Sequence, residues 1–110
     1  MTTATLYTTL EACARTGLTR RILTWWVTAG AIHPHQRTDR KRRQRNAYSA
    51  DNIDRLDAIA RVRNDLVALG YDTIPVSLVR DLWDGLDGAD ATELSHGTVT
   101  ITVRRGLGDE

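Results

Sequence analysis

A dense run of cations between residues 37 and 45 carries the clearest chemistry in this sequence. Six of these nine residues are basic, namely Arg37, Arg40, Lys41, Arg42, Arg43 and Arg45. Guanidinium and ammonium groups bind phosphate oxygens, so this loop suits a nucleic-acid backbone. Just before it, residues 19–27 place Arg20, Arg21, Thr24 and Trp25 between apolar residues at helical spacing. A polar-faced helix beside a cationic loop indicates a protein that reads base edges while holding phosphates.

The charge is divided unevenly along the 110 residues. Residues 1–48 carry nine Lys/Arg against two acidic residues, a net charge of +7, whereas residues 49–110 carry six against twelve, a net charge of −6. The overall charge of +1 hides this division, which indicates that the N-terminal part meets an anion. No apolar run approaches the roughly 20 residues that span a bilayer, and the N-terminus is unlike a signal peptide. With the single Cys13, these features predict a cytoplasmic, nucleoid-associated protein without an internal disulfide.

Two short helices are predicted ahead of the cationic run. Leu6–Tyr7 is expected as an extended lead-in, and Thr8 or Thr9 as the cap of a first helix that ends near Thr16. Its expected buried face, at i, i+3 and i+4 spacing, consists of Leu10, Cys13 and Ala14. Gly17 provides the turn, and Thr19 caps the second helix. The buried stripe expected for that helix is Ile22, Leu23 and Trp26. Two helices joined by a short turn with Gly are typical of a helix-turn-helix.

The remaining chain predicts a wing, two further helices and one strand. Residues 31–47 lack helical periodicity and are expected to form a solvated loop or a two-stranded wing. A helix capped by Ser49 should end at Gly70, and another should run from Pro75 or Val76 to Asp84. The strict alternation over residues 98–104 predicts a strand. We therefore expect a mostly α fold of about four helices with a small wing. It divides into a domain over residues 1–85, an acidic Gly-rich linker over 86–97 and a C-terminal strand over 98–105.

Two sequence blocks resemble the DNA-binding domain of the MerR-type winged helix-turn-helix family. The family pattern Y-T-I-x-E-V-A-x-x-T-G-V-S-x-x-T-L-R-x-W/Y-E-x-x-G-L-L-x-P is similar to Y-T-T-L-E-A-C-A-R-T-G-L-T-R-R-I-L-T-W-W over residues 7–26 and G-A-I-H-P over residues 30–34. The family's R-x-Y-S-x-x-D-I-x-R-L is similar to N-A-Y-S-A-D-N-I-D-R-L over residues 46–56. Val27 replaces a frequent Glu, Asn46 replaces Arg, and the Gly common at the wing tip is missing. The likeness covers about residues 7–85 and does not extend to the family's long coiled coil.

The resemblance implies that the helix from Thr19 enters the major groove of DNA. Arg21 and Thr24 would face base edges, and Arg20 a base or a phosphate. The wing would cross the backbone or enter the neighbouring minor groove. The implied DNA-contacting residues are Thr19, Arg20, Arg21, Thr24, Trp25, Arg37, Arg40, Lys41, Arg42, Arg43, Arg45 and Tyr48. The alternatives are a plain solvated helix surface, a core position for Trp25, and a basic loop that binds any polyanion.

Sequence-specific binding of double-stranded DNA by a small transcriptional regulator is the function we expect. One alternative is an excisionase that bends DNA for a recombinase. Another is a protein-interaction module in which the C-terminal strand meets a partner or a second copy through Val99, Ile101 and Val103. Several copies are expected on DNA, as a dimer or head to tail, with a recombinase or an RNA polymerase component as a protein partner. His33, His35 and Cys13 are too few for a metal site, and no residue pattern indicates a cofactor or an enzyme.

Overall fold

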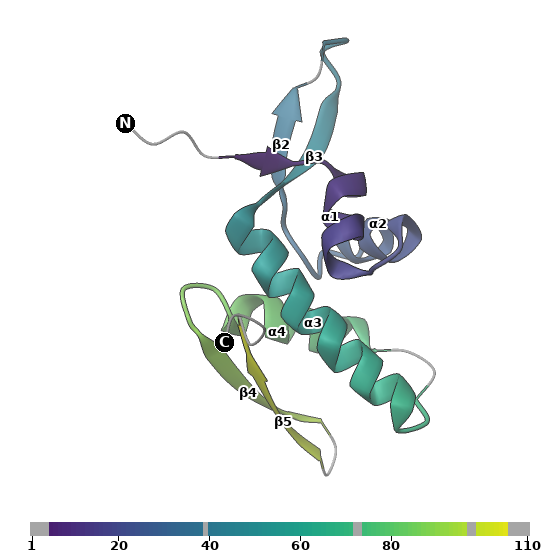
Figure 1. Ribbon diagram of the computed structural model, residues 1–110, viewed down its shortest axis with the longest axis vertical. Coiled ribbons are helices and arrows are strands. Elements are labelled where there is room, and N and C mark those ends of the chain that lie inside the picture. Colours follow the sequence, from purple (N-terminus) through teal and green to yellow (C-terminus); the bar gives the residue numbers. More distant parts are fainter. Residues whose placement is uncertain (1–4, 39, 72–73, 97–98, 106–110) are drawn as a thin grey trace.

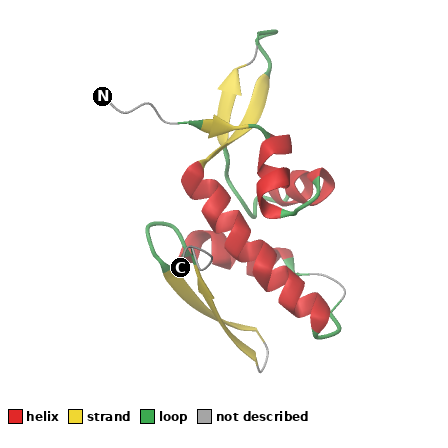
Figure 2. Cartoon of the chain, viewed as in Figure 1, coloured by secondary structure: helices red, strands yellow, loops and turns green. Residues whose placement is uncertain are grey.

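The computed structural model describes residues 5–38, 40–71, 74–96 and 99–105. Within them the chain forms four helices and five short strands, as Figure 1 shows. In chain order the elements are β1 Leu6–Tyr7, α1 Thr9–Thr16, α2 Arg20–Thr28, β2 His35–Thr38, β3 Gln44–Ser49, α3 Ala50–Ala68, α4 Val76–Gly85, β4 Ala91–His96 and β5 Val99–Arg104. Helices fill the middle of the molecule, and the strands lie at its two ends (Figure 2). The predicted mostly α winged helix-turn-helix is confirmed.

Helices α1 and α2 form the expected helix-turn-helix. Thr8 caps α1 through a capping box with Glu11, and Gly17 ends the helix at φ +77°. A left-handed φ of this kind is accessible to Gly without steric cost. The Thr19 side chain accepts a hydrogen bond from the Ile22 N–H and caps α2, as predicted. The turn between these caps sets the angle at which α2 leaves the body of the protein.

The buried face of α1 differs from the predicted one. Leu10 is 65% exposed and Ala14 is exposed, while the buried positions are Ala12 and Thr16. Thr16 tolerates burial because its hydroxyl donates to the Ala12 carbonyl at 2.8 Å. The prediction holds in part for Cys13, which is half-buried and packs against the core. It was wrong for Leu10 and Ala14, because apolar spacing indicates a helix without fixing which side of that helix meets the core.

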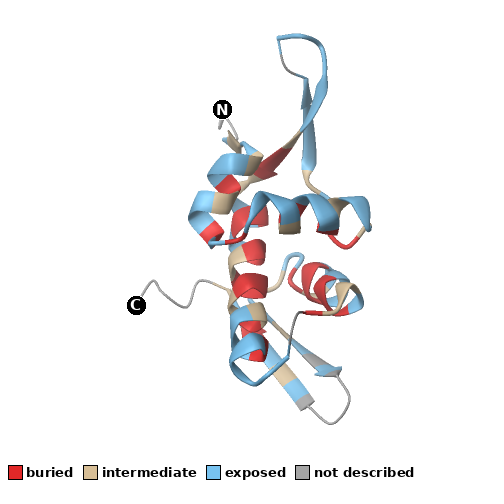
Figure 3. Cartoon of the chain, turned by 90° about the vertical axis from the view of Figure 1, so that its right-hand side faces the viewer, coloured by how far each residue is buried: buried red, intermediate tan, exposed pale blue. Residues whose placement is uncertain are grey.

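Three strands build the wing and join it to the helix-turn-helix. The sheet order is β1-β3-β2, with Tyr7 opposite Tyr48 and Arg37 opposite Arg45. The lead-in strand β1 therefore pairs with the base of the wing, next to the start of α1. The wing's outer part rises away from the helices, and Figure 3 shows that its surface is exposed.

Helix α3 is the central support of the molecule. Its N-terminus is capped by Ser49 through a capping box with Asn52, directly after β3 ends. Leu56 and Ile59 are fully buried and belong to one hydrophobic core that also includes residues of α1, α2 and α4. The wing is thus connected without a linker to the longest and most buried helix.

An unexpected buried cation holds α4 against α3. Arg55 is only 6% exposed, and its guanidinium lies 3.8 Å above the centre of the Trp83 ring. It also donates to the Trp83 carbonyl and pairs with Asp51 at 3.5 Å. Stacking and ion pairing offset part of the cost of removing this charge from water.

The C-terminal segment forms a hairpin in which the predicted strand is paired. Residues 91–96, within the expected linker, form β4, which pairs with β5 so that Ala91 faces Arg104 and His96 faces Val99. Strand β5 therefore pairs neither with the wing nor with the lead-in. Val103 is 4% exposed and packs in the core, which corrects its expected role in meeting a partner. Ile101 is half-buried, and the side chain of Val99 lies outside the described residues.

Candidate nucleic-acid interface

Helix α2 presents a polar face to solvent and an apolar face to the core. Leu23 and Trp26 are fully buried, as predicted. Exposed in this region are all five of its predicted DNA-contacting residues, namely Thr19, Arg20, Arg21, Thr24 and Trp25. Trp25 is 46% exposed, which excludes the alternative that it is a core residue. An indole and two guanidinium groups are therefore available to a ligand along one helix.

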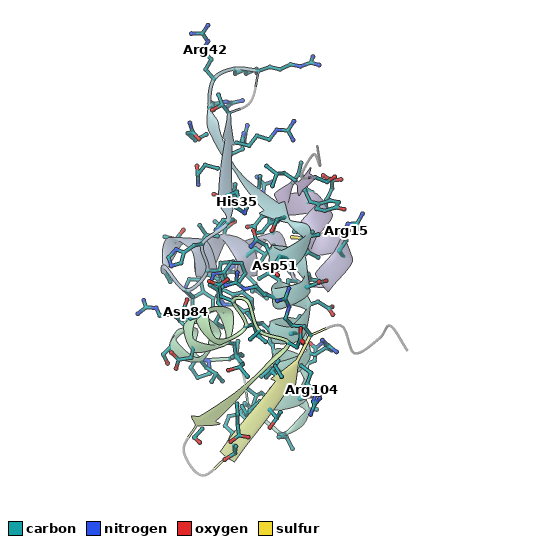
Figure 4. All side chains as sticks on the ribbon, turned by 90° about the vertical axis from the view of Figure 1, so that its left-hand side faces the viewer. Arg15, His35, Arg42, Asp51, Asp84 and Arg104 are labelled. Atoms are coloured by element: carbon teal, nitrogen blue, oxygen red, sulfur yellow. The ribbon has the colours of Figure 1, made fainter. Side chains whose placement is uncertain are left out.

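The wing carries its cations on an exposed hairpin. All six basic residues of the cationic run are exposed. Figure 4 shows Arg42 at the tip, at the end of the molecule away from the C-terminal hairpin. Arg42 has φ +60°, a left-handed conformation that is uncommon for a side-chain-bearing residue. It occupies the turn at which the sequence lacks the expected Gly.

Two side-chain hydrogen bonds connect the strands of the wing. The Gln36 amide donates to the Asn46 side-chain oxygen at 2.9 Å, and the Gln44 amide donates to the Thr38 hydroxyl at 3.2 Å. These residue pairs lie directly opposite each other in the sheet. Cross-strand pairs of this kind stabilise a hairpin that has no core of its own.

Between these two side-chain bonds lies a pair of like charges. Arg37 faces Arg45 directly across the strands, an arrangement that is destabilising in an isolated sheet. The pKa of the Glu11 carboxyl is lowered mainly by hydrogen bonds from Thr8, with smaller contributions from Arg15 and Arg37. The wing thus brings Arg37 and Arg45 together at a place where a bound anion would offset the repulsion between them.

An open groove of about 680 Å³ lies between α2, the start of α1 and the wing. It brings together five of the predicted DNA-contacting residues, which are Arg20, Thr24, Arg37, Arg40 and Arg45. Six further predicted residues are exposed but do not line it, namely Thr19, Arg21, Trp25, Lys41, Arg42 and Arg43. The groove is also lined by residues that the sequence did not indicate as DNA contacts, namely Tyr7, Thr8, Thr9, Leu10, Thr38, Gln44, Asn46 and Ala47.

The first turn of α1 opens into this groove. Thr8, Thr9 and Leu10 line it, and the first backbone N–H groups of a helix have no partner within the helix. The Glu11 carboxylate already accepts from the Thr8 N–H, and the Thr8 hydroxyl accepts from the Glu11 N–H. The helix dipole favours an anion at this end. The capping sequence was visible in the chain, but its position beside the cations was not.

Tyr7 is held at the wall of the groove by a cation–π contact. The Arg15 guanidinium lies 4.5 Å from the centre of the Tyr7 ring. Arg15 is near the end of α1 and Tyr7 is in β1, so the contact joins the lead-in strand to the helix-turn-helix. Because β1 has only two residues, its signal in the sequence was too short to indicate a role in the site.

Tyr48 is not exposed for DNA contact, which corrects the prediction for that residue. It is 1% exposed and belongs to the core. Burial raises the pKa of its phenol, and a hydrogen bond with Thr9 offsets part of that rise. Tyr48 is therefore linked to Thr9, which is one of the residues that line the groove. The family resemblance located the right region but could not show which way this side chain points.

Other chemistry finds no support among the described residues. In the ranges given above, no group of three or more His, Cys, Asp or Glu side chains is arranged to hold a metal ion. Burial raises the pKa of the Cys13 thiol, which disfavours the thiolate needed for nucleophilic or metal chemistry. Among the described residues, none of the helices combines the length and the apolar character that a membrane span requires.

Comparison with known proteins agrees with this geometry. The family model for MerR HTH family regulatory proteins matches residues 7–69, which is more than half of the chain. The matched segment begins at Tyr7 and includes α1, α2, the wing and α3. No curated protein and no solved structure matches the chain. The resemblance seen in the sequence is confirmed, and the chain belongs to the MerR helix-turn-helix family of DNA-binding regulatory proteins.

Proposed function

We propose that this protein binds specific sites in double-stranded DNA and thereby regulates transcription. The observation that carries the proposal is the groove with cationic walls between α2 and the wing. A sugar-phosphate backbone in this groove would place α2 against the adjoining major groove. Arg20, Arg37 and Arg45 would contact phosphates, which fix the position of the protein on the duplex.

Sequence choice would come from the exposed side chains of α2. An Arg side chain can donate two parallel hydrogen bonds to guanine, and each such contact contributes roughly 1–3 kcal/mol of discrimination. Arg21 and Thr24 are exposed on this helix and are the residues that we assign to base edges. Trp25 would pack on the sugar-phosphate backbone, with its indole N–H as a donor.

The wing would supply affinity and salt dependence. Its exposed cations extend beyond the helices, where they would follow the backbone or enter the next minor groove. One short helix and one wing read only a few base pairs, so we propose that two or more copies act together. Residues 1–85 are the proposed DNA-binding unit, and a component of the transcription machinery is the proposed protein partner.

Selection of bound sites from a random duplex pool tests the proposal, followed by titration of the selected site across salt concentrations. We expect an enriched motif and a plot of log K against log salt whose slope is negative, with a magnitude of about 0.9 for each phosphate contact. Arg21→Ala should relax the motif at one position, whereas Arg63→Ala, on α3, should leave it unchanged. Binding with a steep salt slope but no enriched motif would contradict sequence-specific recognition.

A further inference from the structure

The hairpin register shows which backbone groups point away from it. The Arg105 N–H donates to the Asp90 carbonyl at 2.8 Å, in the same register as the strand pairs Ala91–Arg104 to His96–Val99. Residues directly opposite each other alternate between hydrogen-bonded and non-hydrogen-bonded pairs. The backbone groups of Thr100, Thr102 and Arg104 therefore point to the outer edge of β5. Independently, the Arg61 side chain donates to the Arg104 carbonyl at 2.9 Å, which requires that carbonyl to face outward.

The centre of the β5 edge, at Thr100 and Thr102, carries no charge, Pro or bulge of its own. Proteins protect exposed edges with charges, Pro or bulges. Thr100 and Thr102 are exposed, uncharged and β-branched, and Arg61 covers only the Arg104 end. By the same alternation, the outer edge of β4 carries Glu93, which would face or neighbour its own copy if two β4 strands paired. Between the two edges, only that of β5 is free of like-charge repulsion at its centre.

A shallow hollow of about 120 Å³ lies beside this edge. It is lined by Ala58 and Val62 of α3 and by residues 102–104 of β5. Ile101 is half-buried and packs at the margin of the core. The charged side chains of Arg61 and Asp65 also line this hollow, so it is mixed rather than apolar. The half-buried Ile101 is therefore the apolar surface next to this edge that an added strand could cover.

We propose that β5 pairs antiparallel with β5 of a second copy about a two-fold axis at Ile101. Thr100 then lies opposite the partner's Thr102 and exchanges N–H···O bonds with it, and the axis repeats that pair. Ile101 meets the partner's Ile101 in a non-hydrogen-bonded pair, where Cα atoms come within about 4.5 Å. The Arg61–Arg104 bond is kept, because this register uses only Thr100 and Thr102 at the edge.

The self-complementary chemistry favours a second copy over another protein. In this register no charged residue of β5 faces its own equivalent, and a two-fold axis brings the same patch together twice. In this proposal Ile101 keeps the partner role expected from the sequence, whereas Val103 packs within the core of its own chain. The surface is short, so we expect a micromolar dimer that neighbouring DNA sites would strengthen.

Two double variants with nearly the same composition test the register. Thr100→Lys/Thr102→Lys places an introduced ammonium opposite another at both repeated pairs, whereas Thr100→Glu/Thr102→Lys places a carboxylate opposite an ammonium. Both carry the same change at residue 102, which faces Glu93 within the hairpin. In sedimentation velocity on the full chain, we expect dimers from the wild type and the Glu/Lys variant. The Lys/Lys variant should dissociate with a Kd higher by on the order of tenfold.

A disulfide test covers the case in which charged variants unfold. In a Cys13→Ser background, Ile101→Cys should give a covalent dimer on mild oxidation, because the pair at the axis brings the Cβ atoms close. Glu93→Cys, on the other strand, is the control and should remain monomeric. A wild-type chain that stays at its 12.3 kDa monomer mass at high concentration would overturn the proposal, as would equal Kd values for the two double variants. These measurements need no DNA, so their outcome is independent of the proposed function.

Discussion

At the scale of single residues, exposure separates the groups available to DNA from those that support them. Arg21 and Thr24 are exposed on α2, whereas Tyr48 is buried and shares a hydrogen bond with Thr9. Arg37 and Arg45 face each other across the wing. The same residue types therefore have different roles, and each role can be tested with one substitution.

Arg21→Ala is expected to lower discrimination at one base pair by roughly 1–3 kcal/mol, because a bidentate contact with guanine is lost. Competition between the selected duplex and duplexes changed at single positions measures this loss. Arg21→Lys keeps the charge but not the planar fork. It should recover affinity for all duplexes without recovering the discrimination. Equal discrimination by wild type and Arg21→Ala would show that this residue does not read a base.

Arg37→Gln is expected to separate folding from binding. The substitution relieves repulsion with Arg45 and removes an attraction to Glu11, so stability should stay within about 0.5 kcal/mol of wild type. DNA affinity should fall. The magnitude of the slope of log K against log salt should decrease by about 0.9 if one phosphate contact is lost. Urea unfolding and a salt titration of binding measure the two effects. An unchanged salt slope would place Arg37 away from the phosphates.

At the scale of elements, helix caps set the positions of both helices that border the groove. Thr8 and Glu11 form a reciprocal cap on α1, and Thr19 caps α2. The groove depends on these ends because its lining includes the first turn of α1 and the first half of α2. Changes in capping should therefore affect both stability and DNA binding.

Thr19→Ala should destabilise the protein by about 1 kcal/mol through loss of the α2 cap. Thr19→Asp is the matched control, since its carboxylate can accept the same hydrogen bond from the Ile22 N–H. We expect Thr19→Asp to retain stability in urea unfolding yet weaken DNA binding, because it adds a negative charge beside Arg20. If both variants bound DNA as well as wild type, residue 19 would lie outside the interface.

Glu11 should give α1 a stability that depends on pH. The folded-state pKa is lowered, chiefly by the hydrogen bonds from Thr8. The contribution is therefore fully present above the unfolded-state pKa of a Glu and is lost as pH falls through the folded-state pKa. Glu11→Ala should be less stable than wild type at pH 7, and the difference should shrink under acid conditions. Glu11→Gln, which can keep the capping geometry, should lose less. A difference that does not change with pH would contradict a role for the carboxylate.

At the scale of the whole molecule, the wing and the C-terminal hairpin lie at opposite ends of a 48 Å long body. The hairpin is nevertheless joined to α3. Arg105 forms ion pairs with Asp51 and Asp54, and it also donates to the Leu86 and Ala89 carbonyls at 3.2 Å. Asp51 lies two residues after the end of β3, so one network connects the hairpin with the base of the wing.

Deleting residues 86–110 is expected to abolish cooperative unfolding. The deletion removes the fully buried Leu86 and the core residue Val103. It also removes β4, which packs against α4. Circular dichroism during thermal unfolding measures this. Val103→Ala, a milder change, should cost roughly 2 kcal/mol from lost methyl burial and the remaining cavity. A truncated chain that folds and binds DNA as a monomer would assign the hairpin to assembly alone.

Much of the local structure follows from the sequence alone. Thr19 and Ser49 are caps because their side-chain oxygens accept hydrogen bonds from nearby N–H groups. Gly17 adopts the left-handed conformation of the turn. Alternation of β-branched residues was enough to predict β5. These signals depend on neighbours within a few residues, so the chain itself contains them. The family resemblance extended the prediction to α2 and the wing.

Which side of each element meets the rest of the protein was decided only by the tertiary structure. Leu10 lines the groove, whereas Tyr48 is buried in the core. Helix α1 packs against α2, α3 and β3, and these contacts leave Leu10 on its exposed side. Arg55 is buried because Trp83 of α4 packs on its guanidinium and Asp51, one turn earlier in α3, pairs with it. Residues 91–96 form a strand because β5 offers a register partner, although their own composition indicates a linker. These outcomes depend on contacts between distant parts of the chain, which neither local propensity nor spacing contains.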